Sequence, residues 1–284
     1  MIVRNLAQKF FWGAVVGVFT VIVLSPIVEM VFISLSPMSS IDSGALMPVH
    51  WMWSNYVDAW STVNLLAYLL HSILVSVVST FFTVAIALAL SFVLERFYFR
   101  FRSALAKMIL FSQMIPGIAL LLPIYLLYST LQNATHTSII GTFPALISVY
   151  VGISIPLATW LLIGALSGIP KELDEAAYMD GASNLTLLVK VLVPIALPGI
   201  AVAAIFSFLG SWNDLLFSSV MTDNATRTLA IGLQEYVGAG NGGGVLLWNQ
   251  LMAAAVMSSI PAVLFFLAAQ RLIVQGLSAG AVRQ

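Results

Sequence analysis

The side chains that could carry out chemistry are few in this sequence and lie far apart. The three histidines, His50, His71 and His136, lack H-E-x-x-H-like spacing, so they do not indicate a metal site. The sequence has no cysteine, which excludes disulfides, thiolate metal ligands and cysteine nucleophiles. The glycine-rich stretch GAGNGGG (238–244) lacks the lysine and the following Ser/Thr of a P-loop. We therefore predict no catalytic, metal-binding or cofactor-binding residue in this chain.

Polar residues that interrupt the apolar segments suggest instead a path for a solute. Glu29, His71 and Asp214 fall near one end of their segments, whereas proton or ion pathways place ionisable groups near the bilayer centre. The central parts carry neutral polar and aromatic side chains, which suit a neutral, hydroxyl-rich solute. Hydrogen bonds between helices would explain the same residues without a solute. The candidate path residues are His71, Gln113, Tyr150, Trp160, Trp212, Asn213 and Asp214.

These residues must be positioned by an integral membrane fold. Of the 284 residues 61% are hydrophobic and 8% are charged, with a mean hydropathy of +1.03, whereas soluble domains carry about 25% charged residues. The apolar runs are long and do not alternate, so they predict helices and not a β-barrel. We expect an all-α, polytopic membrane bundle with six transmembrane helices, at about 10–35, 66–94, 105–130, 139–168, 187–217 and 248–273.

The distribution of basic residues predicts the orientation of the bundle. With the N-terminus inside, ten of the eleven Lys and Arg residues are cytoplasmic and only Arg227 lies outside. Both termini are therefore expected in the cytoplasm, and segments 36–65 and 218–247 outside. We divide the chain into residues 1–65, with the first transmembrane helix and an outer loop, and residues 66–284, with the transmembrane core. The net charge of zero does not indicate binding to nucleic acid.

A polar segment between the fourth and fifth spans predicts a short cytoplasmic helix at about 170–181. Pro170 suits the first helical position, acids crowd the first turns, and Gly181 suits the C-terminal end. One apolar stripe is expected, formed by Ile169, Leu173, Ala176 and Ala177. Helices that lie on lipid are usually rich in Lys and Arg, and this one is acidic. We therefore expect a protein partner rather than the membrane surface.

The same segment resembles a known signature. Glu175, Ala176, Ala177 and Gly181, followed by Pro194, match the E-A-A-x-x-x-G…P motif of permease subunits of ATP-binding-cassette (ABC) importers, with Val191 and Val193 in place of Ile and Leu. The stretches WNDLLF (212–217), TLAIGL (228–233), MAAAVMSSIP (252–261) and QRLIVQGLSAGAVR (270–283) are similar to the shorter membrane subunit of the binding-protein-dependent carbohydrate (maltose-type) importers. In that subunit many relatives carry Asn-Ser where this chain has His71-Ser72.

The resemblance implies partners and the residues that contact them. Two cytoplasmic ATPase subunits would bind ATP and Mg²⁺, a second homologous permease would complete a heterodimer, and an extracytoplasmic binding protein would deliver the sugar. The complex would lie among lipids in the plasma (inner) membrane of a prokaryote. The resemblance implies outer-loop contacts with the binding protein at Glu235, Tyr236 and Asn241. Contacts with the ATPase would come from Glu172, Leu173, Glu175, Ala176, Ala177, Met179, Asp180, Gly181 and from Gly276, Leu277, Ser278, Ala279 and Gly280 in the C-terminal tail.

We accordingly expect a non-enzymatic permease subunit of a sugar importer, driven by alternating access. ATPase closure would move the 170–181 helix and, through it, spans three to five. One alternative is an importer of another small polar solute, such as a polyamine, phosphate or an amino acid. Another is a secondary carrier or channel that works alone, and a third is an assembly scaffold.

Overall fold

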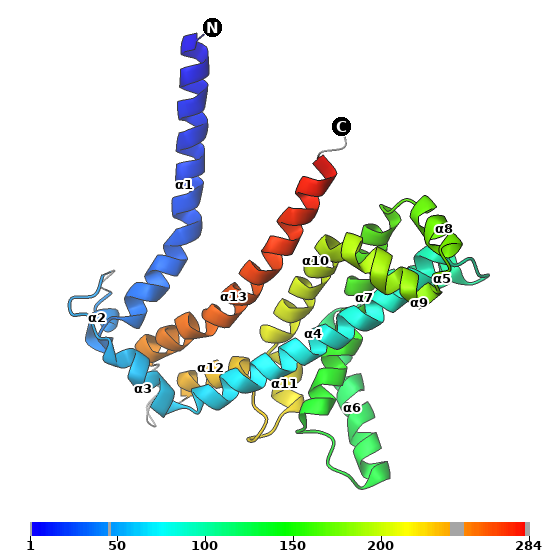
Figure 1. Ribbon diagram of the computed structural model, residues 1–284. Coiled ribbons are helices and arrows are strands. Elements are labelled where there is room, and N and C mark those ends of the chain that lie inside the picture. The colour runs from blue at the N-terminus through cyan, green and yellow to red at the C-terminus, as the bar shows by residue number, and fades with distance from the viewer. Residues whose placement is uncertain (1, 45–46, 239–246, 282–284) are drawn as a thin grey trace. The chain divides into compact units, whose positions relative to one another are not determined.

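The computed structural model describes residues 2–44, 47–238 and 247–281, and over these residues the chain is helical without a β-strand (Figure 1). Six helical segments are long and apolar enough to cross a membrane, which confirms the expected all-α membrane fold: Phe11–Ser34, Leu65–Arg96, Gly117–Thr135, Phe143–Ser167, Asn184–Trp212 and Trp248–Ile273. The helices are α1 (Ile2–Ser34), α2 (Met38–Asp42), α3 (Ser54–Thr62), α4 (Leu65–Arg96), α5 (Arg102–Ser112), α6 (Gly117–Thr135), α7 (Phe143–Ser167), α8 (Glu172–Met179), α9 (Asn184–Thr186), α10 (Val193–Trp212), α11 (Leu216–Met221), α12 (Leu229–Gly238) and α13 (Trp248–Ala281).

The third span lies further along the chain than the sequence predicts. A continuous helix over 105–130 is wrong, because the chain breaks between α5 and α6 and the apolar span is Gly117–Thr135. Pro116 stands at the break with an extended backbone (φ −59°, ψ 132°). Proline has no N–H for the helical ladder and disfavours the α conformation in the residue before it. The span therefore begins after Pro116.

The fifth span also has different bounds from those expected. It begins at Asn184 rather than 187 and ends at Trp212 rather than 217, where a short break separates α10 from α11. Between α9 and α10 the segment Leu187–Leu192 is π-helical. Pro194, which cannot donate an N–H to the turn before it, lies two residues after the end of this segment. The chain thus enters the span through a widened turn.

The chain forms two compact units, residues 1–66 with 232–259 and residues 67–231 with 260–284. In the first unit the buried side-chain amide of Asn55 bonds α3 to neighbouring segments. The Asn55 Nδ2 donates to the carbonyls of Ser34 (2.9 Å) and Ser36 (3.0 Å), and Asn249 Nδ2 donates to Asn55 Oδ1 (3.0 Å). These hydrogen bonds hold Asn55 on α3 to the end of α1 and to α13. The division of the chain at residue 65 stays a prediction.

In the second unit the core lies mainly between α7 and α10. Leu162 and Ala203, one from each helix, are fully buried and pack with Ala87 and Ala158. A Cβ placed on Gly199 would lie 2.3 Å from the Cβ of Ala165, so only glycine allows the two helices to approach so closely. This close contact fixes the two ends of the polar segment that connects α7 to α10.

Candidate functional site

The expected surface helix is present as α8, between the fourth and fifth spans. It begins at Glu172, so Pro170 lies two residues before it and not at its first position. Its end is fixed by Gly181 in the left-handed conformation (φ +80°), where the N–H of Ala182 donates to the Ala177 carbonyl at 3.0 Å. The helix and its glycine stop are therefore confirmed.

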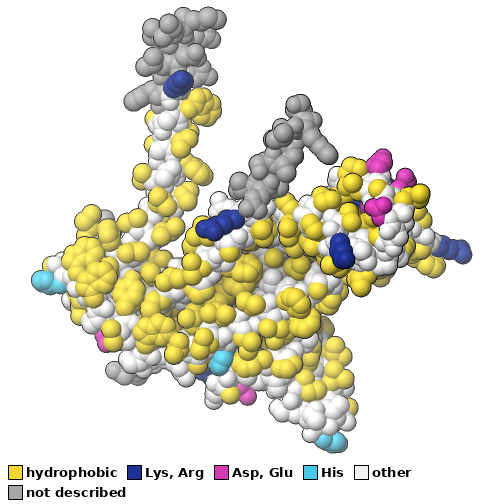
Figure 2. Space-filling view, in the orientation of Figure 1, with side chains coloured by type: hydrophobic (Ala, Val, Ile, Leu, Met, Phe, Trp, Pro, Cys, Tyr) yellow, Lys and Arg dark blue, Asp and Glu magenta, His cyan; other side chains and the backbone are white. Residues whose placement is uncertain are grey.

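The side chains of α8 divide into an inner and an outer face. Ala177 packs against the buried cluster that contains Ile169 and Leu166, whereas Leu173 (40% exposed) and Met179 (89% exposed) face outward. The single apolar stripe expected from Ile169 to Ala177 is wrong, because Ile169 precedes the helix and does not follow its periodicity. The outer face consists of Glu172, Leu173, Glu175, Ala176, Met179 and Asp180. Acidic side chains gather over α8 in Figure 2.

A buried ion pair attaches α8 to α4. The Nε of Arg96, the last residue of α4, lies 2.8 Å from Oδ2 of Asp174, and the two side chains are 5% and 11% exposed. The Arg96 guanidinium also donates to the carbonyl of Ile169 at 3.1 Å. In the sequence Asp174 was one of several acids suited to the helix dipole, and Arg96 indicated only the orientation. Sequence reasoning missed the pair because the two residues are 78 positions apart.

An exposed contact joins the loop after α4 to the residue before α8. Lys171 Nζ donates to the Tyr98 hydroxyl at 3.2 Å, and the guanidinium of Arg102 lies 5.2 Å from the centre of the Tyr98 ring. The Lys171 hydrogen bond and positive charge lower the pKa of Tyr98 below its usual value, and Arg102 acts in the same direction. This contact lies at the surface, so it holds α8 less firmly than the buried ion pair.

Two of the candidate path residues lie together at the far end of α7 and α10. The Tyr150 hydroxyl donates to Asp214 Oδ2 at 2.8 Å, and the N–H of Ser218 donates to the same oxygen at 3.0 Å. Tyr150 is buried, Asp214 is half-buried, and burial raises the pKa of the Asp214 carboxyl. The pair links α7 to the turn before α11. It is therefore a hydrogen bond between helical segments, the alternative to a solute contact that the sequence analysis named.

The other path residues are dispersed. Trp212 is buried and stacks on Phe208 (5.4 Å between ring centroids), whereas Trp160 is 54% exposed and Asn213 is exposed. His71 Nδ1 lies 2.9 Å from the carbonyl oxygen of Arg227. The adjacent Ser72 accepts the Leu229 N–H at 2.8 Å. His71-Ser72 therefore holds the segment before α12.

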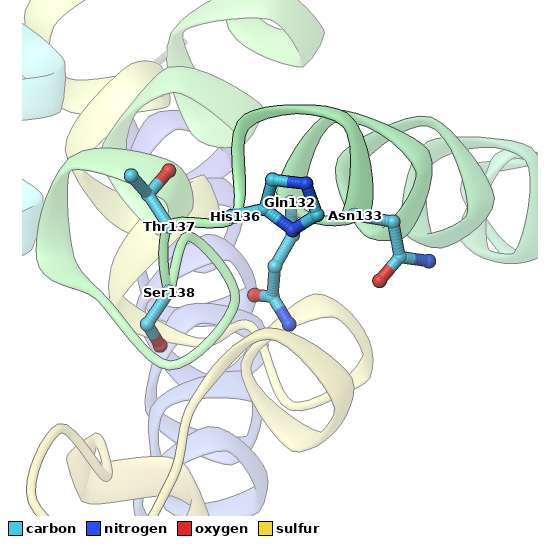
Figure 3. Close-up of a pocket in the computed structure, with 5 residues that line it drawn as sticks. All are labelled: Gln132, Asn133, His136, Thr137 and Ser138. Atoms are coloured by element: carbon cyan, nitrogen blue, oxygen red, sulfur yellow. The ribbon is translucent and has the colours of Figure 1, made fainter.

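Gln113 lies at a groove between the α5–α6 break and α7. The groove has a volume of about 560 Å³, and its polar lining includes Gln113, Tyr128 and Ser148 among mainly apolar side chains. The Tyr128 and Ser148 hydroxyls are hydrogen-bonded at 2.6 Å. A second, open pocket at the end of α6 is lined by the polar residues Gln132, Asn133, His136, Thr137 and Ser138 (Figure 3). Among the described residues no three His, Asp or Glu side chains lie close enough to share a metal ion.

The residues expected to contact the other partners lie partly outside the described residues. Tyr236 is fully buried and donates its hydroxyl to the Ala59 carbonyl, so its side chain is covered, and burial raises its pKa to about 12. Glu235 is half-exposed on α12, and Asn241 lies outside the described residues. The backbone of residues 276–280 continues α13, but the side chains of Gly276, Leu277, Ser278, Ala279 and Gly280 lie outside the described ones.

The six apolar spans define a multi-pass helical membrane protein. Residues 86–279 match the family described as binding-protein-dependent transport system inner membrane component. The chain belongs to this family. It is thus a multi-pass, non-enzymatic transport subunit of the inner membrane that works with a solute-binding protein.

Two relatives agree with this assignment, and a solved structure has a similar fold. The chain is 31% identical to the trehalose/maltose transport system permease protein MalG of Thermococcus litoralis, over 93% of this chain and 92% of that one. It is 30% identical to the diacetylchitobiose uptake system permease protein NgcG of Streptomyces coelicolor, over 95% and 87%. Its fold is similar to a chain of a bacterial ABC transporter involved in the import of the acidic polysaccharide alginate, with a TM-score of 0.78 and 19% identity over 94% and 97% of the two chains.

Proposed function

We propose that this chain is the permease subunit of an ABC importer for a sugar, and that α8 is the surface on which a cytoplasmic ATPase docks. The observation that carries the proposal is the outer face of α8 in a chain of this family. Leu173, Ala176 and Met179 are exposed on a short helix whose glycine stop and buried anchor fix its position. Exposed apolar side chains rimmed by acids are typical of a protein contact.

The remaining partners follow from the same proposal. The N- and C-termini lie in the cytoplasm with α8, ATP and Mg²⁺ bind to two ATPase subunits, and a second, homologous permease completes a path surrounded by lipid. Closure of the ATPases displaces α8 and moves the spans packed against it, so that the path opens toward the binding protein. This chain supplies half of the path, and its α8 couples opening of the path to ATP binding and hydrolysis by the ATPases.

A sugar is the solute class that the relatives and the side chains favour. The relatives named above transport trehalose or maltose and diacetylchitobiose. The groove between the α5–α6 break and α7 offers an amide from Gln113 and hydroxyls from Tyr128 and Ser148, beside apolar surface. Such a mixed surface suits the hydroxyls and the apolar faces of a sugar ring.

The proposal is tested by assembling the chain with its second permease, ATPases and binding protein in lipid vesicles. We expect sugar uptake that requires ATP and the binding protein, and mass spectrometry of the co-purified binding protein should identify the sugar. Glu175→Lys on the outer face should reduce ATPase binding, whereas the charge reversal Asp58→Lys on exposed α3 should not. Uptake of a sugar by this chain alone without ATP, or full ATPase binding by Glu175→Lys, would contradict the proposal.

A further inference from the structure

The guanidinium of Arg96 contacts the chain on both sides of the point where α8 begins. Arg96 contacts the carbonyl of Ile169, three residues before the helix, and the carboxylate of Asp174 in its first turn. The two contacts lie on either side of the point where α8 begins. Through them the last residue of α4, the second span, holds both the entry to α8 and the helix itself.

Because both side chains are buried, the ion pair between Arg96 and Asp174 is costly to break. The Arg96 and Asp174 side chains are almost entirely removed from water, so separating them would leave two uncompensated buried charges. Phe92 lies one turn before Arg96 on the same face of α4 and belongs to the cluster against which Ala177 packs. The end of α4 therefore shares an ion pair with α8, and Phe92 and Ala177 belong to the same apolar cluster.

The neighbouring exposed contacts differ in strength. Glu95, adjacent to Arg96, pairs with Arg102 at 3.5 Å, and these side chains are 17% and 28% exposed, whereas Asp174 is 11% and Arg96 5% exposed. Lys171 contacts Tyr98, which is 81% exposed. Water screens such pairs, so they can break at little cost when α8 moves. They provide matched controls for the buried pair.

We propose that Arg96 and Asp174 are positioning residues that fix α8 to α4, so that displacement of α8 by the ATPase moves the second span together with the spans on either side of α8. The inference rests on the proposed function of α8 and adds a specific element to it. The second span becomes part of the moving body. The ion pair keeps the outer face of α8 in a constant orientation relative to that span.

The test measures the number of ATP molecules hydrolysed per solute imported by the complete complex in lipid vesicles. Arg96→Gln and Asp174→Asn each leave one buried charge unpaired, and we expect either change to raise this ratio by about tenfold. The double variant Arg96→Gln/Asp174→Asn has no unpaired charge and should recover most of the coupling. The conservative variant Arg96→Lys should lie between wild type and Arg96→Gln, and the control Glu95→Gln should leave the ratio unchanged.

A second measurement uses the absence of cysteine from the chain. A spin label on Val93→Cys, an exposed position on α4, should change its spectrum when ATP binds to the wild-type complex and should lose that response in the single variants. Should the single variants fail to assemble, the label response of Arg96→Lys decides, with a weakened response supporting the proposal. An unchanged ratio or label response in the assembled variants would overturn it. A wild-type complex without sugar-dependent ATP turnover would contradict the proposed function instead.

Discussion

Replacement of Gly181 by alanine is expected to weaken the docking of the ATPase through the backbone alone. Gly181 has φ +80°, and a Cβ at this position would have no atom within 4 Å. The cost therefore comes from the left-handed conformation and not from a clash, and for an L-residue with a Cβ it is about 1–2 kcal/mol. Asparagine adopts this conformation more readily, so Gly181→Asn is the matched control although its side chain is larger. The N–H of Gly181 and of Ala182 would keep their partners in both variants only if the turn is retained.

The assay is the affinity of the purified ATPase for the permease complex in nanodiscs, with sugar-stimulated ATP turnover measured on the same samples. A change of 1–2 kcal/mol alters an equilibrium by roughly 5- to 30-fold. We expect the affinity of Gly181→Ala to fall by up to roughly 30-fold, and that of Gly181→Asn to stay closer to wild type. Equal affinity of Gly181→Ala and wild type would refute the reasoning. So would a Gly181→Asn variant as weak as alanine, because size and not conformation would then be responsible.

Three further predictions concern other parts of the chain. Met179→Asp, at a side chain that is 89% exposed, should weaken ATPase binding by at least about tenfold without changing the thermal unfolding of the permease, since the residue has few contacts within the chain; a shifted unfolding temperature would contradict this. Gly199→Ala should destabilise the permease by about 1–3 kcal/mol in detergent unfolding, because its Cβ would meet that of Ala165, and Ala165→Gly should restore the stability. The hydrogen bond from the Thr226 hydroxyl lowers the pKa of Asp223. This contact therefore stabilises the loop between α11 and α12 at pH values above the usual carboxyl pKa, and the stabilisation is lost as the pH falls through the lowered pKa. Thr226→Val should return the pKa of Asp223 toward its usual range in an NMR titration of the carboxyl carbon.

The sequence was sufficient for features that depend on local pattern. Apolar runs of span length predict the six membrane helices, and the acids before Gly181 predict α8 with its stop. These signals lie within one element each, so no tertiary contact was needed to see them. Pro116 is also a break signal in the sequence, but the residues on both sides of it are apolar, so the helix was predicted to continue through it.

Features that depend on distant contacts could not be predicted. Nothing in the sequence pairs Arg96 with Asp174, because each also suits a solvated position near the membrane surface. Tyr236 was expected at a protein contact and is buried against Ala59, a partner on another helix. Tyr150 likewise uses its hydroxyl on Asp214. The partners of these polar residues are set by the packed fold and not by any local pattern.

The orientation of the termini and the partner of α8 are tested together by one cross-linking measurement. Because the chain has no cysteine, Met179→Cys is a single thiol on the outer face of α8, and Val57→Cys, 70% exposed on α3, is a matched control. In the active complex with its ATPase and binding protein, we predict that a thiol-reactive cross-linker joins Met179→Cys to the ATPase and does not join Val57→Cys to it. Failure of Met179→Cys to cross-link to the ATPase in an active complex, or equal cross-linking from Val57→Cys, would contradict the assignment of α8 as the coupling surface.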